Sequence, residues 1–147
     1  MRISSRFTIA IHVLTAIDVL KDEYKITSDL LASSVHTNPV VIRRILQQLK
    51  AADLIKVTRG IGGASLNKEA SEISLFDIYC AVDCVESGDL FRFHEDPNIK
   101  CPVGRNIHAV LDDKLIKIQE AFENEMKKTT LADILEETKQ LINTEYD

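Results

Sequence analysis

The sequence predicts a mainly α-helical fold that carries one small β-hairpin. Apolar residues recur at three- and four-residue steps in most segments, which is the period of an amphipathic helix. Between residues 54 and 66 the period changes to alternation, interrupted by a cluster of glycines, as expected of two strands joined by a turn. Three helices followed by this hairpin form a winged helix-turn-helix, and the remaining residues supply a long helix beyond it.

The composition limits the class of protein. The chain has 147 residues, 45% hydrophobic and 28% charged, which suits one folded core with an additional arm and excludes a disordered chain. Charges interrupt every long apolar stretch, so no membrane span is predicted. His12 and Asp18 interrupt the apolar run at the N-terminus, and no small-residue cleavage site follows it. We therefore expect a cytoplasmic protein without a signal peptide.

The net charge of -5 is divided unevenly along the chain. Residues 1–68 contain ten Lys and Arg against five Asp and Glu, whereas residues 69–147 contain eight against eighteen. Because only the first part is basic, the sequence predicts that this part contacts a polyanion such as nucleic acid.

Two helices are predicted at the start of the chain. The first covers residues 5–20, where Phe7, Leu14 and their neighbours at helical spacing form a wide apolar stripe. The second covers residues 28–35 and is capped by Thr27 or Ser28, whose hydroxyl groups accept from free backbone N–H groups. Its apolar side chains face the same core as those of the first helix.

A third helix is predicted from Pro39 to about Ala52. Asn38 is a favoured N-cap residue, and proline at the first helical position costs nothing because no N–H is needed there. One face of this helix is apolar and carries Ile42, Ile45, Leu46 and Leu49. The other face carries Val40, Arg43, Arg44, Gln47, Gln48 and Lys50. Joined to the preceding helix by a two-residue link, it completes a helix-turn-helix.

The hairpin is predicted from a strand over residues 54–58, a turn at 59–63 and a returning strand at 64–66. The glycines of the turn also suggest a phosphate-binding loop. Such a loop needs a helix directly after it, so that free backbone N–H groups face the phosphate. Here a second strand follows, so the segment is interpreted as the wing.

Three further helices are predicted over residues 74–84, 102–127 and 131–142, with a polar loop at 86–100. The middle helix is too long for one small core to cover, so part of its apolar stripe is expected to contact a second copy of the chain. The chain is accordingly divided into a winged helix-turn-helix (1–68), a connecting helix and sensor-type loop (69–101), and dimerisation helices (102–147).

Double-stranded DNA is the polyanion that this arrangement suits. A recognition helix needs an apolar face toward its own domain and hydrogen-bond donors toward the major groove, with apolar side chains for thymine methyl groups. The glycine turn permits close approach, and an arginine at its start suits a narrow minor groove. The predicted DNA-binding residues are Arg6, Ser28, Asn38, Pro39, Val40, Val41, Arg43, Arg44, Gln47, Arg59 and Gly60.

Nearly the whole chain resembles the Rrf-two (Rrf2) family of bacterial winged-helix regulators. The resemblance rests on residues 6–14, on 37–46, on 59–66 and on Cys101-Pro102-Val103-Gly104. It implies a homodimer that crosses its long helices, binds a near-palindromic operator and acts as a repressor of transcription.

The family's best-known cofactor is a [2Fe–2S] cluster on three cysteines separated by five residues. Only the last of these is present here, as Cys101, because the preceding positions are Glu95 and Asp89 and the later histidine position is Gly104. A cluster needs several thiolate or imidazole ligands, so no cofactor and no metal site are predicted. The remaining route to a cluster is non-standard ligation by Cys84, Cys101 and His94.

Cys101 is instead the candidate redox sensor. Placed just before Pro102, it would cap the long helix, where free N–H groups and the charge of Lys100 favour the thiolate. The alternative is a small buried apolar residue. Cys80 and Cys84, one helical turn apart, are interpreted as core residues, since a zinc site would need two more ligands.

Two other functions were weighed against DNA binding. One is a redox- or ligand-responsive protein-interaction module that keeps the fold without strong DNA binding. The other is an enzyme, but the sequence offers no paired catalytic carboxylates, nucleophile elbow or zinc motif. The sequence therefore predicts a non-enzymatic DNA-binding regulator, with an oxidant or a small molecule as its effector.

Overall fold

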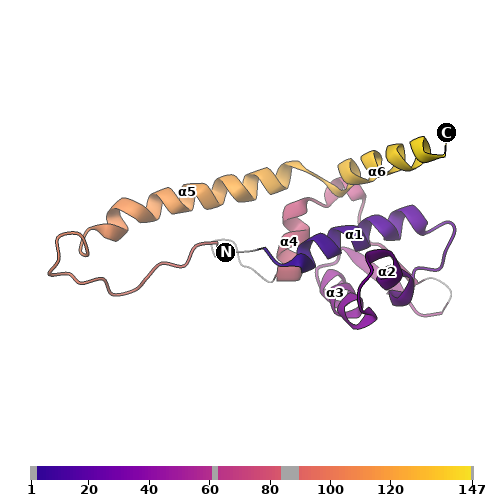
Figure 1. Ribbon diagram of the computed structural model, residues 1–147, viewed down its shortest axis with the longest axis horizontal. Coiled ribbons are helices and arrows are strands. Elements are labelled where there is room, and N and C mark those ends of the chain that lie inside the picture. The colour runs from indigo at the N-terminus through magenta and orange to yellow at the C-terminus, as the bar shows by residue number, and fades with distance from the viewer. Residues whose placement is uncertain (1–2, 61–62, 84–89, 147) are drawn as a thin grey trace.

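The computed structural model describes residues 3–60, 63–83 and 90–146. Its elements in chain order are α1 (Ser5–Leu20), α2 (Ser28–Val35), α3 (Pro39–Ala51), β1 (Ile55–Thr58), β2 (Gly63–Leu66), the short 3-10 helix η1 (Ala70–Glu72), α4 (Leu75–Asp83), α5 (Ile107–Lys128) and α6 (Leu131–Glu145). Figure 1 shows a body, built from all the other elements, from which α5 extends as a long arm. The predicted class, mainly α-helical with a small β wing, is confirmed.

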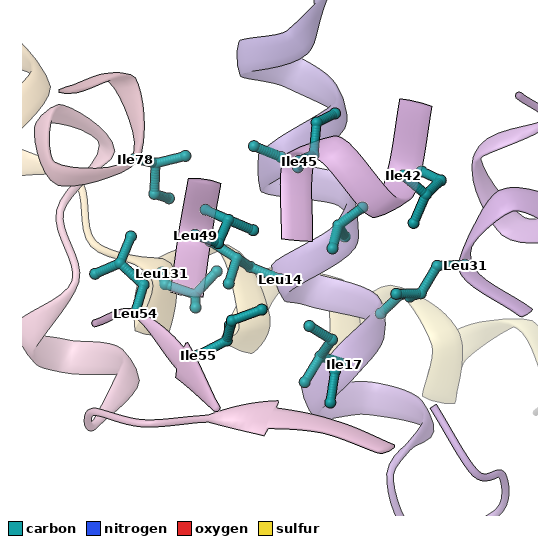
Figure 2. Close-up of a cluster of buried hydrophobic side chains, with 14 of the residues drawn as sticks. Leu14, Ile17, Leu31, Ile42, Ile45, Leu49, Leu54, Ile55, Ile78 and Leu131 are labelled. Carbon is teal, nitrogen blue, oxygen red and sulfur yellow. The ribbon is translucent and has the colours of Figure 1, made fainter. Parts of the chain in front are cut away.

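Helix α1 runs through the middle of the body and contacts α2, α3, α4, α6 and β2. This position explains its wide apolar stripe, since a helix with neighbours on several sides must be apolar on several sides. Leu14 and Ile17 are fully buried among residues of α3 and the hairpin (Figure 2). Each buried Leu or Ile contributes about 1.5–3 kcal/mol relative to exposure, so α1 supplies much of the core's stability.

The helix-turn-helix is fixed by caps that the sequence predicts. Thr27, not Ser28, caps α2, and its hydroxyl accepts from the Leu30 N–H at 3.1 Å. The Asn38 side chain caps α3 by accepting from the Val40 N–H at 2.8 Å. Between the helices, His36 adopts the left-handed conformation with φ 65° and its N–H bonds the Ala32 carbonyl, which sets the angle at which α3 leaves α2.

The hairpin pairs β1 with β2 in antiparallel register, with Ile55 opposite Leu66 and Thr58 opposite Gly63. Ile26, in the link between α1 and α2, pairs with the hairpin as well, and the sequence did not reveal this contact. It lies in a parallel bridge with Gly63, and its carbonyl accepts from the Ala64 N–H at 3.1 Å. The wing is therefore joined to the link before α2 and does not stand alone.

The C-terminal helix returns to the body. The Leu131 N–H donates to the Ile73 carbonyl at 2.7 Å, and the Leu75 N–H donates to the Thr129 carbonyl at 3.0 Å. These bonds place α6 against η1 and α1, and Figure 1 shows α6 beside α1. A capping box between Thr130 and Asp133 starts the helix, which continues three residues beyond the predicted end at residue 142.

Helix α5 begins at Ile107, so the predicted start at Pro102 is wrong. Residues 101–106 form hydrogen-bonded turns instead, in which the Arg105 N–H donates to the Cys101 carbonyl at 3.0 Å. The body meets α5 only near the C-terminal end of the helix in the described part of the chain, where Phe122 lies edge-on to Tyr79 of α4. Residues 90–93 lie beside the arm, where the Leu90 N–H donates to the Gln119 side-chain oxygen and Phe93 lies edge-on to His108.

None of the described helices combines the length and the apolar character that crossing a membrane requires.

One ion-pair cluster ties the two ends of the chain together and makes stability depend on pH. The Asp18 carboxylate of α1, with a side chain 12% exposed, accepts from Lys21 at 2.9 Å and from Lys139 of α6 at 3.0 Å. Burial alone would raise the pKa of Asp18, but the hydrogen bonds from the two ammonium groups outweigh it and lower that pKa.

We therefore expect Asp18 to stabilise the fold at pH values above about 3.9, its ordinary unfolded-state pKa, and to lose that contribution as the pH falls through its lowered folded-state pKa. Asp18→Asn should lower the free energy of unfolding at pH 7 by about 0.5–1 kcal/mol, since both lysines are half exposed. Urea unfolding at pH 7 and pH 3 measures this. Asp113→Asn, on the exposed face of α5, is the control, and a deficit of Asp18→Asn that persists unchanged at pH 3 would contradict the prediction.

Candidate nucleic-acid interface

Helix α3 presents a polar face to solvent because its opposite face is locked into the core. Ile42, Ile45 and Leu49 are fully buried, which fixes the rotation of the helix about its axis. The side chains left outside include Arg43, and the exposed members of this face are Val40, Arg43, Arg44, Gln47 and Lys50. Val40 is 54% exposed in the first turn of α3.

A groove of about 430 Å³ lies between this face of α3, the start of α2 and the hairpin. Its apolar lining consists of Ile26, Leu46, Val57 and Ala64. Its polar lining consists of Lys25, Thr27, Ser28, Arg43, Gln47, Lys50 and Thr58. Among the described residues that line it there are three cations and no carboxylate, so the groove is suited to an anion.

The structure brings together four of the predicted DNA-binding residues in this groove: Ser28, Arg43, Gln47 and Gly60. Gly60 has φ 91°, a conformation that favours glycine, and nothing lies within 4 Å of the position that a Cβ would occupy there. Arg59, just before it, is exposed. The two turn residues that follow, 61 and 62, lie outside the described part of the chain.

The other predicted residues lie outside the groove. Arg44 is exposed on α3, and Val41 is half buried against the core, so of the two valines only Val40 faces solvent. Arg6 lies at the start of α1, where its Nε donates to the Ser4 hydroxyl at 3.4 Å, and it does not line the groove. Its predicted phosphate contact would therefore be a separate one.

Asn38 and Pro39 lie at the rim of a second, more open hollow, beside Asp29 and His36. The Asn38 side-chain oxygen is engaged in capping α3, and Pro39 starts the helix. Both residues position the first turn of α3.

Sequence reasoning missed Lys25 and Thr58 as residues of this site. Lys25 is distant from α3 along the chain and reaches the groove because its neighbour Ile26 pairs with Gly63. Thr58 follows Val57 at the end of β1, and the strand pattern by itself does not tell which face meets α3. The positive charge of Lys25 in a basic N-terminal half was the one available signal.

Cys101 is not at the N-terminus of α5, so its predicted capping position is wrong. It lies in the turn before the helix, where its N–H donates to the Asn98 carbonyl at 3.1 Å. Hydrogen bonds from the backbone N–H groups of Gly104 and Val103 nevertheless lower the pKa of the Cys101 thiol. Gly104 is required for this turn, because a Cβ there would clash with the Asn98 carbonyl oxygen.

The two cysteines that the structure describes, Cys80 and Cys101, lie too far apart to ligate one [2Fe–2S] cluster together. Cys80 lies in α4 beside Glu123, toward the C-terminal end of α5, and burial raises the pKa of its thiol. Cys101 precedes the other end of α5, and the 16 residue steps from Ile107 to Glu123 span about 24 Å at 1.5 Å per step. The two cysteines therefore cannot share a cluster within one chain. Cys84 and Asp89 lie outside the described residues.

The chain is similar to known regulators over nearly its whole length. The family model Rrf2, described as an iron-dependent transcriptional regulator, matches residues 3–137. YwnA of Bacillus subtilis (strain 168), named as a candidate HTH-type transcriptional regulator, is 45% identical over 133 residues, which cover 90% of this chain and 96% of YwnA.

Solved structures agree with these matches. A crystal structure described as that of a candidate DNA-binding protein is 37% identical, with a TM-score of 0.68 over 89% of this chain and 99% of that one. CymR, the global cysteine regulator of B. subtilis, has a TM-score of 0.70 at 20% identity, over 92% of this chain and 97% of CymR, and therefore shows the fold alone. With the family model covering most of the chain and YwnA aligned at 45% identity, the protein belongs to the Rrf2 family of winged-helix transcriptional regulators.

Proposed function

We propose that this regulator recognises a specific DNA sequence through the first turns of α3. The observation that carries the proposal is the exposed face of α3, where Val40, Arg43, Arg44 and Gln47 face solvent and Arg43 and Gln47 also line a cationic groove. A helix of this kind fits the major groove of B-DNA, with its N-terminal residues at the base edges.

The side chains divide the work of recognition according to their chemistry. Arginine presents two parallel donors that match the O6 and N7 acceptors of guanine, and Arg43 and Arg44 have this capacity. Val40 supplies the apolar contact that the thymine methyl group favours. Gln47 lies one turn further along α3 and contacts the backbone, and Arg59 enters the neighbouring minor groove.

The acting species is proposed to be a homodimer formed through α5. Val110 and Ile118 are 57% and 53% exposed on one side of the arm. At 100° per residue they lie on the same stripe as Ile107 and Leu111, beyond the short contact with α4. A second copy of α5 crossing this stripe would bury it. A two-fold dimer presents two α3 helices, so the operator would be a near-palindrome.

The dimer is further proposed to repress transcription and to respond to oxidation of a thiol. A dimer seated on a promoter excludes the transcription machinery, which makes repression the simplest output. Hydrogen peroxide oxidises a thiolate to a sulfenic acid, with cleavage of the O–O bond and loss of hydroxide. At Cys101 this change would alter the turn that precedes α5, next to the proposed dimer surface, and weaken DNA binding.

The test is binding of the full chain to duplex fragments from its own promoter region and to mixed-sequence duplexes, followed by fluorescence anisotropy. We expect one fragment to bind far more tightly than the others, with an affinity that falls steeply between about 50 and 200 mM salt. Arg43→Ala should weaken the free energy of binding to that fragment by about 1–3 kcal/mol, because a bidentate base contact is lost. It should also reduce the preference for that fragment over the mixed-sequence duplexes.

Arg92→Ala, which removes an exposed arginine beside the arm, is the matched control. Equal affinity of the wild type for every duplex would contradict sequence-specific recognition and favour an interaction module. Mild peroxide should release the preferred fragment from the wild type and leave Cys101→Ser bound. Equal release from both proteins would contradict the proposed role of Cys101.

A further inference from the structure

We propose that the groove between α3 and the hairpin seats the DNA backbone strand that separates the major groove from the neighbouring minor groove, with Lys25 and Lys50 as phosphate ligands. This inference rests on the proposed function. It assigns residues that the base-reading face does not include.

The path of the strand follows from the arrangement of the elements. If the first turn of α3 lies in the major groove and the turn after β1 reaches the minor groove, the space between them faces one phosphodiester strand, because each pair of adjacent grooves in B-DNA is divided by one strand. In this structure that space is the groove of about 430 Å³, bounded by α3 on one side and by β1 and β2 on the other.

The lining has the chemistry that phosphate requires. Lys25, Arg43 and Lys50 come from two separate segments and converge on one groove without an intervening carboxylate among its described lining residues. The nearest acidic residue of α2, Asp29, lines the hollow at the helix-turn-helix link instead. The hydroxyl groups of Ser28 and Thr58 add donors at two sides of the groove. Ammonium and hydroxyl groups bind phosphate oxygens without reading sequence.

The protein backbone that lines the groove leaves room for a DNA strand. Gly60 and Gly63 both line it, and a Cβ at Gly60 would meet nothing within 4 Å. The pairing of Ile26 with Gly63 fixes the backbone beside Lys25, in the link before α2, relative to the hairpin. The backbone that forms the two sides of the groove is therefore preorganised.

Lys25 and Lys50 should act on affinity and leave sequence preference unchanged. Each phosphate contact contributes about 0.9 to the slope of log affinity against log salt, through release of counterions. Lys25→Gln and Lys50→Gln should each reduce the slope by about 0.9 and weaken binding roughly fivefold to tenfold near 0.1 M salt, and the double variant should lose about twice as much slope. The loss should be the same on the preferred fragment and on a mixed-sequence duplex.

The control is Lys68→Gln, which removes the same charge from the same basic half at an exposed position outside the groove. Anisotropy titrations of the full-length variants at several salt concentrations give the slopes, and thermal unfolding verifies that each variant is folded. Slopes of Lys25→Gln and Lys50→Gln equal to those of the wild type and Lys68→Gln would overturn the proposal while leaving DNA binding intact. Failure of the wild type to bind any duplex would instead overturn the proposed function and this inference with it.

A free phosphate ion is the other ligand with this chemistry. A second measurement distinguishes it from the DNA backbone as the occupant of the groove. If inorganic phosphate stabilises the wild type against thermal unfolding but not the Lys25→Gln/Lys50→Gln variant, while both bind duplex with the same slope, the groove holds a small anion and the proposal is wrong. A reduced slope in the variant, whatever the effect of inorganic phosphate, supports the backbone strand as the occupant.

Discussion

Gly63→Ala is expected to lower the free energy of unfolding by about 3 kcal/mol and to abolish tight DNA binding. Gly63 has φ 65°, which costs a residue with a side chain about 1–2 kcal/mol. In addition, its new Cβ would clash with the carbonyl oxygen of Ile26, the acceptor of the Ala64 N–H. Relief of the clash requires loss of that hydrogen bond, which adds about 1 kcal/mol. The hairpin would then move away from α3 and widen the groove.

Gly60→Ala is the matched control for this prediction. Gly60 also has a positive φ, of 91°, but open space surrounds the position of its Cβ. Gly60→Ala should therefore lower the free energy of unfolding by about 1 kcal/mol, from backbone strain alone. Thermal unfolding distinguishes the two, since for a chain of this size 1 kcal/mol corresponds to about 2–4 °C in Tm. Equal losses in the two variants would show that the contact between the hairpin and Ile26 does not support the wing.

Ile118→Asp is expected to convert the protein to a monomer and to weaken binding to the preferred fragment by roughly 10²–10⁴-fold. Ile118 is half exposed in one chain, so the substitution leaves the core intact. In a dimer formed through α5, however, it would place a carboxylate in an apolar contact, where an unpaired charge is strongly unfavourable. A monomer engages one half-site at a time and loses the avidity that two linked recognition helices provide.

Ala109→Asp is the matched control, since Ala109 is exposed on the opposite face of α5 and also becomes an aspartate. Sedimentation velocity of the two variants reports the oligomeric state, and anisotropy on the preferred fragment reports the affinity. A dimer that persists in Ile118→Asp would contradict the proposed interface and direct attention to another face of the molecule.

The sequence by itself determined the elements whose signals are local. The helices at residues 5–20 and 28–35 were predicted with their observed bounds, because apolar periodicity and capping residues depend on neighbours a few positions away. Asn38-Pro39 marked the start of α3, and the burial of Ile42, Ile45 and Leu49 followed from their spacing. The exposure of Arg43 and Gln47 followed in turn, since the two faces of one helix are complementary.

The tertiary structure decided what depends on contacts between distant segments. Pro102 is acceptable as a first helical residue. The i→i+3 bonds from the Cys101 N–H to the Asn98 carbonyl and from the Asn106 N–H to the Val103 carbonyl nevertheless hold that segment in turns, and α5 starts at Ile107. The pairing of Ile26 with Gly63 brings Lys25 into the groove, and no local pattern encodes it. Side-chain spacing specifies which face of an element is apolar. The packing of all the apolar faces into one core decides which other element covers that face. The same packing decides which charges lie together at the edge of the core.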